Sequence, residues 1–228
     1  MSAEVVSTER SGQTREAIMA AAERLFAERG LLAVSSRQIS EAAGQGNVSA
    51  VAYHFGTRAG LVRAIMRRHS EAVERIRLRM LDEIGGSDDV RDWVACLVRP
   101  VPEHLATLGT PSWHARFAAQ VMTDPVLRAI ITDEALAREP LWRILQGLGR
   151  RLASVPAQVR AERGDMARQL IIHTCAERER ALAEGTHTRL TSWEDTAVAL
   201  TDAVTGLLLA PVTPRPPHAR TAPYEDHR

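Results

Sequence analysis

A stretch of small and hydrogen-bonding side chains between residues 47 and 58 has the types and spacing needed to contact DNA bases. Four apolar residues fall at i, i+3, i+4 and i+7 and would share one helix face: Val48, Val51, Ala52 and Phe55. The side chains left for the other faces are those of Ser49, Ala50, Tyr53 and His54. A single helix fits a major groove, where outward side chains of these kinds can reach base edges.

Two short helices separated by a tight turn must position these side chains. Ser35 followed three residues later by Gln38 is a capping-box helix start, and Gly44 suits the left-handed residue that ends such a helix. Arg37 falls in the first turn, which repels cations, so an external anion such as phosphate is expected beside it. After the turn at 45–47 the second helix begins, which predicts a helix-turn-helix.

One helix before this motif and a long helix after it complete the N-terminal part of the chain. The apolar stripe over residues 12–29 predicts a helix that packs on the motif, with Phe26 and Phe55 in a shared core. Thr57 is a cap for a long helix that runs to about Ile84 and joins this small domain to the rest. Further on, Pro and Gly separate amphipathic helices, and no segment has a convincing strand pattern.

Composition and charge narrow the class of protein. The chain has 228 residues and a net charge of +1, so any affinity for nucleic acid must come from a local patch. Residues 1–69 hold nine Arg against six Glu, a modest positive excess. The isolated Cys96 and Cys175 argue against a cysteine zinc site and for a reducing compartment. Without a signal-peptide pattern or a run able to span a bilayer, we expect a cytoplasmic protein.

Four short segments carry a specific pattern. They are Ala21-Ala22 with Leu25-Phe26-Ala27-Glu28-Arg29-Gly30, Arg37-Gln38-Ile39-Ser40, Ala42-Ala43-Gly44, and Tyr53-His54-Phe55-Gly56-Thr57-Arg58 with Leu61. This pattern covers roughly residues 12–70 and resembles the tetracycline-repressor (TetR) family of bacterial transcription regulators. Downstream only the number and order of helices resemble the family.

The resemblance implies a homodimer whose paired helix-turn-helices read a palindrome, often with a small ligand that releases the DNA. It places Ser36, Arg37 and Gln38 at a helix start facing phosphate, and Arg58 at the next helix start, also against phosphate. The residues that it places on or beside the recognition helix are Asn47, Ser49, Ala50, Tyr53 and His54. Tyr53 and His54 could instead pack on the domain surface, and Arg37 could be a solvated charge.

Bulky apolar side chains with a few polar ones gather in the middle third of the chain, among short helices broken by Pro, and predict a ligand pocket. The predicted ligand-binding residues are Trp93, His104, Trp113, Phe117, Gln120 and Trp142. The alternative is that these side chains form a solid core. No cofactor is predicted, and no metal site, because His104, His114 and His173 lack metal-like i, i+4 spacing with a carboxylate partner.

Two apolar faces near the C-terminus predict a four-helix dimer interface. Its predicted residues are Val159, Met166, Leu170, Leu200, Val204, Leu207 and Leu208. The alternative is that these faces fold back on their own subunit. The charge run from Glu177 to Arg180 is predicted to be a solvated helix face.

The predicted fold is all-α: an N-terminal three-helix, homeodomain-like helix-turn-helix domain, joined by a long helix to a C-terminal helical ligand-binding and dimerisation domain. The predicted divisions are a flexible arm, the DNA-binding domain, the larger helical domain and a disordered Pro-rich tail, over residues 1–10, 11–56, 57–210 and 211–228.

The predicted function is that of a sequence-specific DNA-binding transcriptional regulator, a repressor released from a palindromic operator by an unknown small apolar effector. Its partners would be double-stranded DNA and a second copy of the chain. An enzyme is not predicted, because G-x-S-x-G, H-E-x-x-H and P-loop motifs are all absent. The alternative is a helical ligand- or protein-interaction module that no longer binds an operator.

Overall fold

A computed structural model describes residues 3–186 and 192–213. Every regular element in these two ranges is a helix, so the predicted all-α class is confirmed. The helices are α1 (Ala3–Arg29), α2 (Ser36–Ala42), α3 (Ala50–Phe55), α4 (Arg58–Ile84), α5 (Val90–Val98), α6 (Pro100–Thr107), α7 (His114–Thr123), α8 (Pro125–Leu136), α9 (Glu139–Arg151), α10 (Ala157–Glu184) and α11 (Trp193–Leu209). None of these helices combines the length and the apolar character needed to cross a bilayer.

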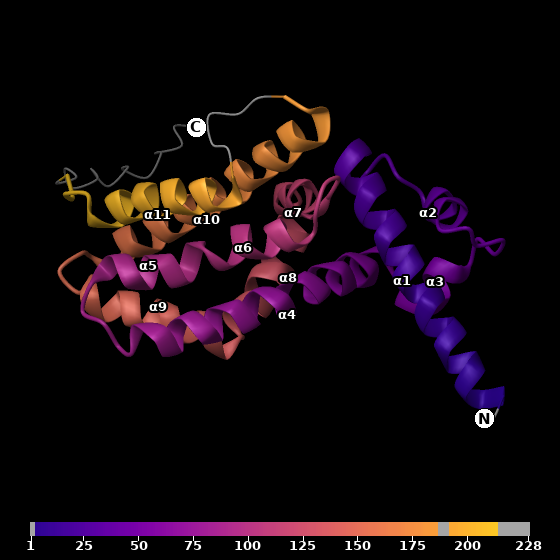
Figure 1. The fold of residues 1–228 in the computed structure, drawn as a ribbon, viewed down its shortest axis with the longest axis horizontal. Coiled ribbons are helices and arrows are strands. Elements are labelled where there is room, and N and C mark those ends of the chain that lie inside the picture. Colours follow the sequence, from indigo (N-terminus) through magenta and orange to yellow (C-terminus); the bar gives the residue numbers. More distant parts are fainter. Residues whose placement is uncertain (1–2, 187–191, 214–228) are drawn as a thin grey trace, which may run out of the picture.

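The helices form a small head and a longer body (Figure 1). The head consists of α1, α2 and α3, and α4 runs from the head along one side of the body. The helices α10 and α11 pack on each other and lie along the opposite side of the body from α4. The predicted arrangement, a helix-turn-helix domain joined by a long helix to a helical domain, is confirmed.

Local capping explains where the helices of the head begin and end. The Ser35 hydroxyl accepts a hydrogen bond from the Gln38 amide at 3.3 Å, and the Gln38 side chain accepts one from the Ser35 amide at 2.8 Å. This is the predicted capping box. Thr57 caps α4 by accepting from the Gly60 amide at 3.0 Å. Gly44 has a φ of +68°, the left-handed conformation expected at that turn.

Two predicted boundaries differ from the structure. The predicted arm over residues 1–10 overlaps α1, which already begins at Ala3. Thr191 with Glu194 three residues later is a capping-box pattern and predicts the start of the last helix, but Ser192 is its cap and accepts from the Asp195 amide at 2.9 Å. Residues 214–228, most of the predicted tail, lie outside the described ranges.

The core of the head extends into the body. It contains the predicted Phe26 together with apolar residues of α4, and Phe55 packs at its edge. Phe117 of α7 also lies in this core, with its ring 6.0 Å from that of Phe26, and residues of α8 complete it. The predicted domain boundary at residues 56/57 therefore divides a single hydrophobic core.

A second core fills the body between α4, α5, α9, α10 and α11. Trp93 is buried there, and its indole nitrogen donates to the Ser87 carbonyl at 2.7 Å. Its ring packs against Gly147 of α9, where a Cβ atom would lie 2.1 Å from ring carbons. Two helices thus approach closely because one contact position carries no side chain.

Candidate nucleic-acid interface

The outward face of α3 carries an exposed aromatic side chain at its centre. Tyr53 is 82% exposed, which is unusual for an aromatic residue on a short helix. Ser49 and Ala52 beside it are also exposed. Asn47 accepts hydrogen bonds from the Ser49 amide at 2.9 Å and hydroxyl at 2.7 Å, so it fixes the turn that leads into the helix. The face therefore presents one large hydrogen-bonding ring among small groups.

The register of α3 differs from the prediction. The helix begins at Ala50, so Val48 precedes it and is 52% exposed, although it was predicted to face inward. Ala50 was predicted to face DNA, but it is only 8% exposed and belongs to the core of the head. Ala52, predicted to face inward, is exposed instead. The inward face of α3 thus runs through Ala50, Val51 and the half-buried Phe55 and not through Val48 and Ala52, so the prediction of a DNA contact at Ala50 is wrong.

Two of the three residues predicted to face phosphate at the start of α2 are exposed. Ser36 and Arg37 are exposed, and the guanidinium of Arg37 pairs with Glu41 at 2.8 Å one helical turn on. This ion pair raises the pKa of Arg37, chiefly through the hydrogen bond to Glu41. Both side chains remain more than half exposed, so the guanidinium can exchange its partner for another anion. Gln38 is engaged in the capping box.

Arg58 has an internal role that was not predicted. Its guanidinium donates to the main-chain carbonyls of Leu31 and Val34, in the connection between α1 and α2, and it lies 5.7 Å from the Phe26 ring centroid. These bonds tie the start of α4 to the connection. Two of the five N–H donors of the guanidinium are used in this way and the residue is exposed, so the phosphate contact by Arg58 stays a prediction for the remaining donors.

His54 faces the junction between head and body more than the outward side of α3. It is half-buried, with its ring edge-on to Tyr53 at 5.0 Å. It also lines an open hollow of about 550 Å³ between α1, α3 and α4. Most other side chains around that hollow are charged: Arg15, Glu16, Arg63, Arg67, Arg68 and Glu71.

The six predicted ligand-binding residues are not brought together in one cavity. Phe117 lies in the core of the head, Trp93 in the core of the body, and Trp142 is 54% exposed. Trp113 and Gln120 are half-buried on or beside α7. None of the six lines the hollow beside α3 or a smaller one of about 170 Å³ between α7, α8 and α10.

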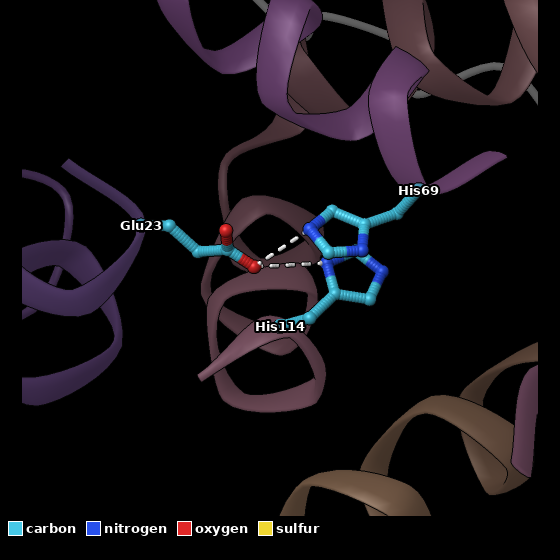
Figure 2. A group of neighbouring side chains, drawn as sticks. All are labelled: Glu23, His69 and His114. Carbon is cyan, nitrogen blue, oxygen red and sulfur yellow. Dashed lines mark ion pairs between the residues drawn. The ribbon is translucent and has the colours of Figure 1, made fainter. Parts of the chain in front are cut away.

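A cluster of buried polar side chains joins head and body (Figure 2). Glu23 comes from α1, His69 from α4 and His114 from α7, and all three are buried. One carboxylate oxygen of Glu23 lies 2.9 Å from His69 Nε2 and 3.5 Å from His114 Nδ1. The two imidazole rings are stacked, with centroids 3.6 Å apart. His104 Nε2 lies 2.8 Å from His69 Nδ1 on the far side of that ring.

The charge states of this cluster follow from burial and from its internal contacts. Burial alone would raise the pKa of Glu23, but contacts with His114 and His69 outweigh it and hold the pKa well below its ordinary range. Burial, and secondarily the nearby His114, lowers the pKa of His69. The same two causes, with His69, lower the pKa of His104 to about 4. At neutral pH the cluster therefore contains an ionised carboxylate beside neutral imidazoles at His69 and His104.

No local sequence motif predicts this cluster, because its residues are far apart along the chain. The absence of a predicted metal site rested on sequence spacing, whereas the structure brings ligand-type side chains together from three separate helices. His173, considered with His104 and His114, is not among them. A charged residue on the inward face of an amphipathic helix was the available signal, since Glu23 follows the buried Met19 at i+4 and precedes the buried Phe26.

A second buried carboxylate holds the helix that carries His114. Glu179 of α10 is 1% exposed, so its predicted place on a solvated face is wrong. Its oxygens accept hydrogen bonds from the amides of Ala115 and Arg116 at 3.1 and 2.9 Å and from the Ser112 hydroxyl at 2.9 Å. These amides belong to the first turn of α7, which has no cap from its own sequence.

Three of the seven predicted dimer residues lie inside their own subunit. Leu200, Val204 and Leu208 of α11 belong to the core of the body, because this side of the helix faces α5 and α6. Val159 and Leu207 are half-buried, and Leu207 packs against that core. Met166 and Leu170 of α10 are 54% and 38% exposed and remain on the outer face.

Comparison with known proteins gives a family match for the N-terminal part of the chain. Residues 18–65 match the bacterial regulatory proteins of the tetR family. A TetR-family regulator from Streptomyces coelicolor A3 is 18% identical over 86% of this chain and 95% of its own, with a TM-score of 0.45. The TetR-like regulator LfrR from Mycobacterium smegmatis, in complex with proflavine, is 23% identical over 90% and 99%, also with a TM-score of 0.45. No curated protein matches the chain.

Proposed function

We propose that this chain, which carries the N-terminal domain of the tetR family of bacterial regulatory proteins, is a sequence-specific transcriptional regulator that binds duplex DNA through α2 and α3. The observation that carries the proposal is the match over residues 18–65, together with the exposed face around Tyr53 inside that segment. The match supports a regulatory role for the segment that contains α2 and α3.

The proposed interface uses two kinds of contact, one with phosphate and one with bases. Arg37 at the start of α2 would contact phosphate, which gives affinity for any duplex and a dependence on salt. Tyr53 on α3, with Ser49 and Ala52 beside it, would approach base edges and give sequence preference. Both side chains are exposed on the head, on helices held in register by the same core.

A palindromic operator would require two heads in one particle. We place the dimer contact on the outer faces of α10 and α11. The exposed apolar residues there are Met166, Leu170, Val198 and Leu209. Charged residues normally cover a helix face exposed to water, so a second copy is the simplest cover for these side chains.

In more detail, we propose that the protein is a repressor and that a small apolar ligand releases it from DNA. A ligand can release DNA only if it binds the released conformation more tightly. Because Trp93 and Phe117 pack in different cores, such a ligand would have to open a space that the described conformation lacks. The second candidate is an interaction module without an operator, and direct measurement of DNA binding separates the two.

The test is selection from random duplexes, followed by fluorescence anisotropy on the enriched sequence at several salt concentrations. Tyr53→Ala is expected to reduce the preference for the selected sequence by about 1–3 kcal/mol for each base that the tyrosine reads. Arg37→Ala is expected to weaken binding to all duplexes and to lower the salt slope by about one. Arg143→Ala removes a similar i, i+4 ion pair on α9, with Glu139 at 3.4 Å, and is the matched control. Equal binding of selected and random DNA by the wild-type protein would refute the proposal.

A further inference from the structure

The structure assigns a binding site for a first-row divalent metal ion of the zinc class to Glu23, His69 and His114, at the junction of head and body. We further propose that the bound ion fixes the head relative to the body and thereby changes affinity for DNA. This second statement rests on the proposed function, whereas the first stands without it.

The residue types select the class of ion. Two imidazoles and one carboxylate suit zinc and its first-row neighbours, whereas magnesium and calcium prefer oxygen ligands alone. One ligand atom from each of the three side chains lies within 4.8 Å of the other two. In a tetrahedral site with bonds of about 2.0–2.1 Å, ligand atoms lie roughly 3.3 Å apart. The observed separations from Glu23, 2.9 Å to His69 and 3.5 Å to His114, lie on either side of that value.

The poorly satisfied nitrogen of His114 is a second observation. His114 is only 8% exposed, and among the described residues its Nδ1 makes no well-formed hydrogen bond: its contact with the Glu23 oxygen is long, at 3.5 Å. A buried polar atom without a partner is costly, and such atoms are rare in folded proteins. The Nδ1 atom lies near the same oxygen that contacts His69 (Figure 2). An ion between the three side chains would satisfy it.

Outer contacts already orient two of the three ligands. His69 uses Nε2 toward Glu23, while its Nδ1 lies 2.8 Å from His104 Nε2, a contact that orients the ring plane and in which either nitrogen can be the donor. The other oxygen of Glu23 accepts from Arg68 at 2.6 Å, and Arg68 also pairs with Glu16 at 3.0 Å. Arg68 thus holds the carboxylate oxygen that the histidines do not contact, and it neutralises charge there.

Binding requires one specific rearrangement. The rings of His69 and His114 are parallel within 13°, so their lone pairs run side by side and do not meet. The two rings must splay apart for both nitrogens to converge on one ion. Since Glu23 is on α1, His69 on α4 and His114 on α7, the ion would tie these three helices together, and we propose that the splaying of the rings shifts α4 and α7 against α1. Metal binding is therefore coupled to the angle of the head, which in a dimer sets the spacing of the two recognition helices.

The first measurement is direct binding of Zn²⁺ and Co²⁺ to the chelator-treated full chain. Zn²⁺ is followed by competition with a chromophoric chelator, and Co²⁺ by its visible absorption, which reports a low-coordinate site with nitrogen ligands. We expect one ion per chain, with Glu23→Gln and His114→Gln weakening binding at least tenfold. His104→Gln, which removes only an orienting contact, is expected to weaken it by roughly 10- to 100-fold. The matched control is His173→Gln, on α10 and outside the cluster.

Folding of each variant is checked by circular dichroism. If the Glu23 or His114 variants do not fold, NMR of the wild-type protein loaded with Co²⁺ identifies the ligands instead. Two imidazole ligands should give two exchangeable, paramagnetically shifted N–H resonances. Binding of equal strength in wild type, Glu23→Gln and His114→Gln, or no binding by the wild type at micromolar Zn²⁺, would overturn the site.

The second measurement repeats DNA anisotropy with and without Zn²⁺. A change of at least fivefold that is abolished in His114→Gln supports the coupling to the head. Tight Zn²⁺ binding with unchanged DNA affinity would overturn the coupling and leave the site. Tight Zn²⁺ binding by a protein that selects no DNA sequence would instead overturn the proposed function, so the failures are distinguishable.

Discussion

Glu179→Ala should destabilise the protein far more than a typical substitution in a charge-rich helix. The carboxylate of Glu179 replaces the missing N-cap of α7 and accepts from Ser112, from the amides of Ala115 and Arg116, and from the Arg116 guanidinium at 3.2 Å. Removing it leaves main-chain donors and part of a guanidinium buried without their acceptor. The first turn of α7 would then lose both its hydrogen bonds and its favourable dipole partner.

The size of the effect can be bounded from these contacts. Hydrogen bonds to a charged group contribute about 1.5–3 kcal/mol each, but bonds to one shared carboxylate are not additive. Breaking a buried ion pair by removing one partner costs about 3–5 kcal/mol, and we adopt that range for Glu179→Ala. Glu179→Gln keeps one oxygen acceptor and should be destabilised by about half as much. For a chain of this size, about 3–5 kcal/mol corresponds to a fall in Tm of roughly 6–20 °C.

Urea unfolding followed by circular dichroism measures this difference. The matched control is Glu177→Ala, two residues earlier on the same helix, where the side chain is 69% exposed and pairs with Arg180 at 3.2 Å. That variant should stay within about 0.5 kcal/mol of the wild type. If Glu179→Ala is as stable as Glu177→Ala, then Glu179 does not hold α7 and the account of this helix is wrong.

Two further substitutions test packing and assembly. Gly147→Ala should lower the free energy of unfolding by about 1–2 kcal/mol, because the new Cβ would lie 2.1 Å from carbons of the buried Trp93 ring. The control is Gly149→Ala on the same helix, whose Cβ meets nothing within 4 Å and which should stabilise the protein by up to about 1 kcal/mol. Equal effects of the two substitutions in urea unfolding would contradict the packing argument. Leu170→Arg should convert a dimer of twice 25.1 kDa into a monomer, as measured by light scattering. The control is Val126→Arg, at an apolar residue of α8 that is 68% exposed, and this variant should remain a dimer. A Leu170→Arg protein that is still dimeric would show that α10 is not part of the interface.

Features that depend on neighbours along the chain could be predicted from the sequence. The capping box at Ser35 and Gln38, the Thr57 cap and the end of α4 at Ile84 are all set by residues within one or two turns. The start of α3 could not be predicted as well, because Asn47 competes with the helix by bonding to Ser49, which moves the first helical residue to Ala50.

Features built from distant residues had no local signal. Glu23, His69 and His114 are each ordinary residues within their own helices, and only the packing of α1, α4 and α7 brings them together. Glu179 lies in a run of alternating charges that resembles a solvated surface, yet this position of the helix faces α7. The sequence shows the apolar stripe of α11, but periodicity predicts a buried face without saying whether its own subunit or a partner covers it.

The core of the head has a consequence for anyone who wishes to cut or graft this protein. The family match ends at residue 65, but Phe117 and Val121 of α7 and Leu127 and Ile131 of α8 fill the same core as Phe26. A fragment that stops after α4 would leave the Phe26 ring without its stacked neighbour and would expose apolar surface to water. The head is thus not a transplantable module: a chimera that keeps its shape must carry α7 and α8 along with the recognition helix, or replace their four side chains with others of equal volume.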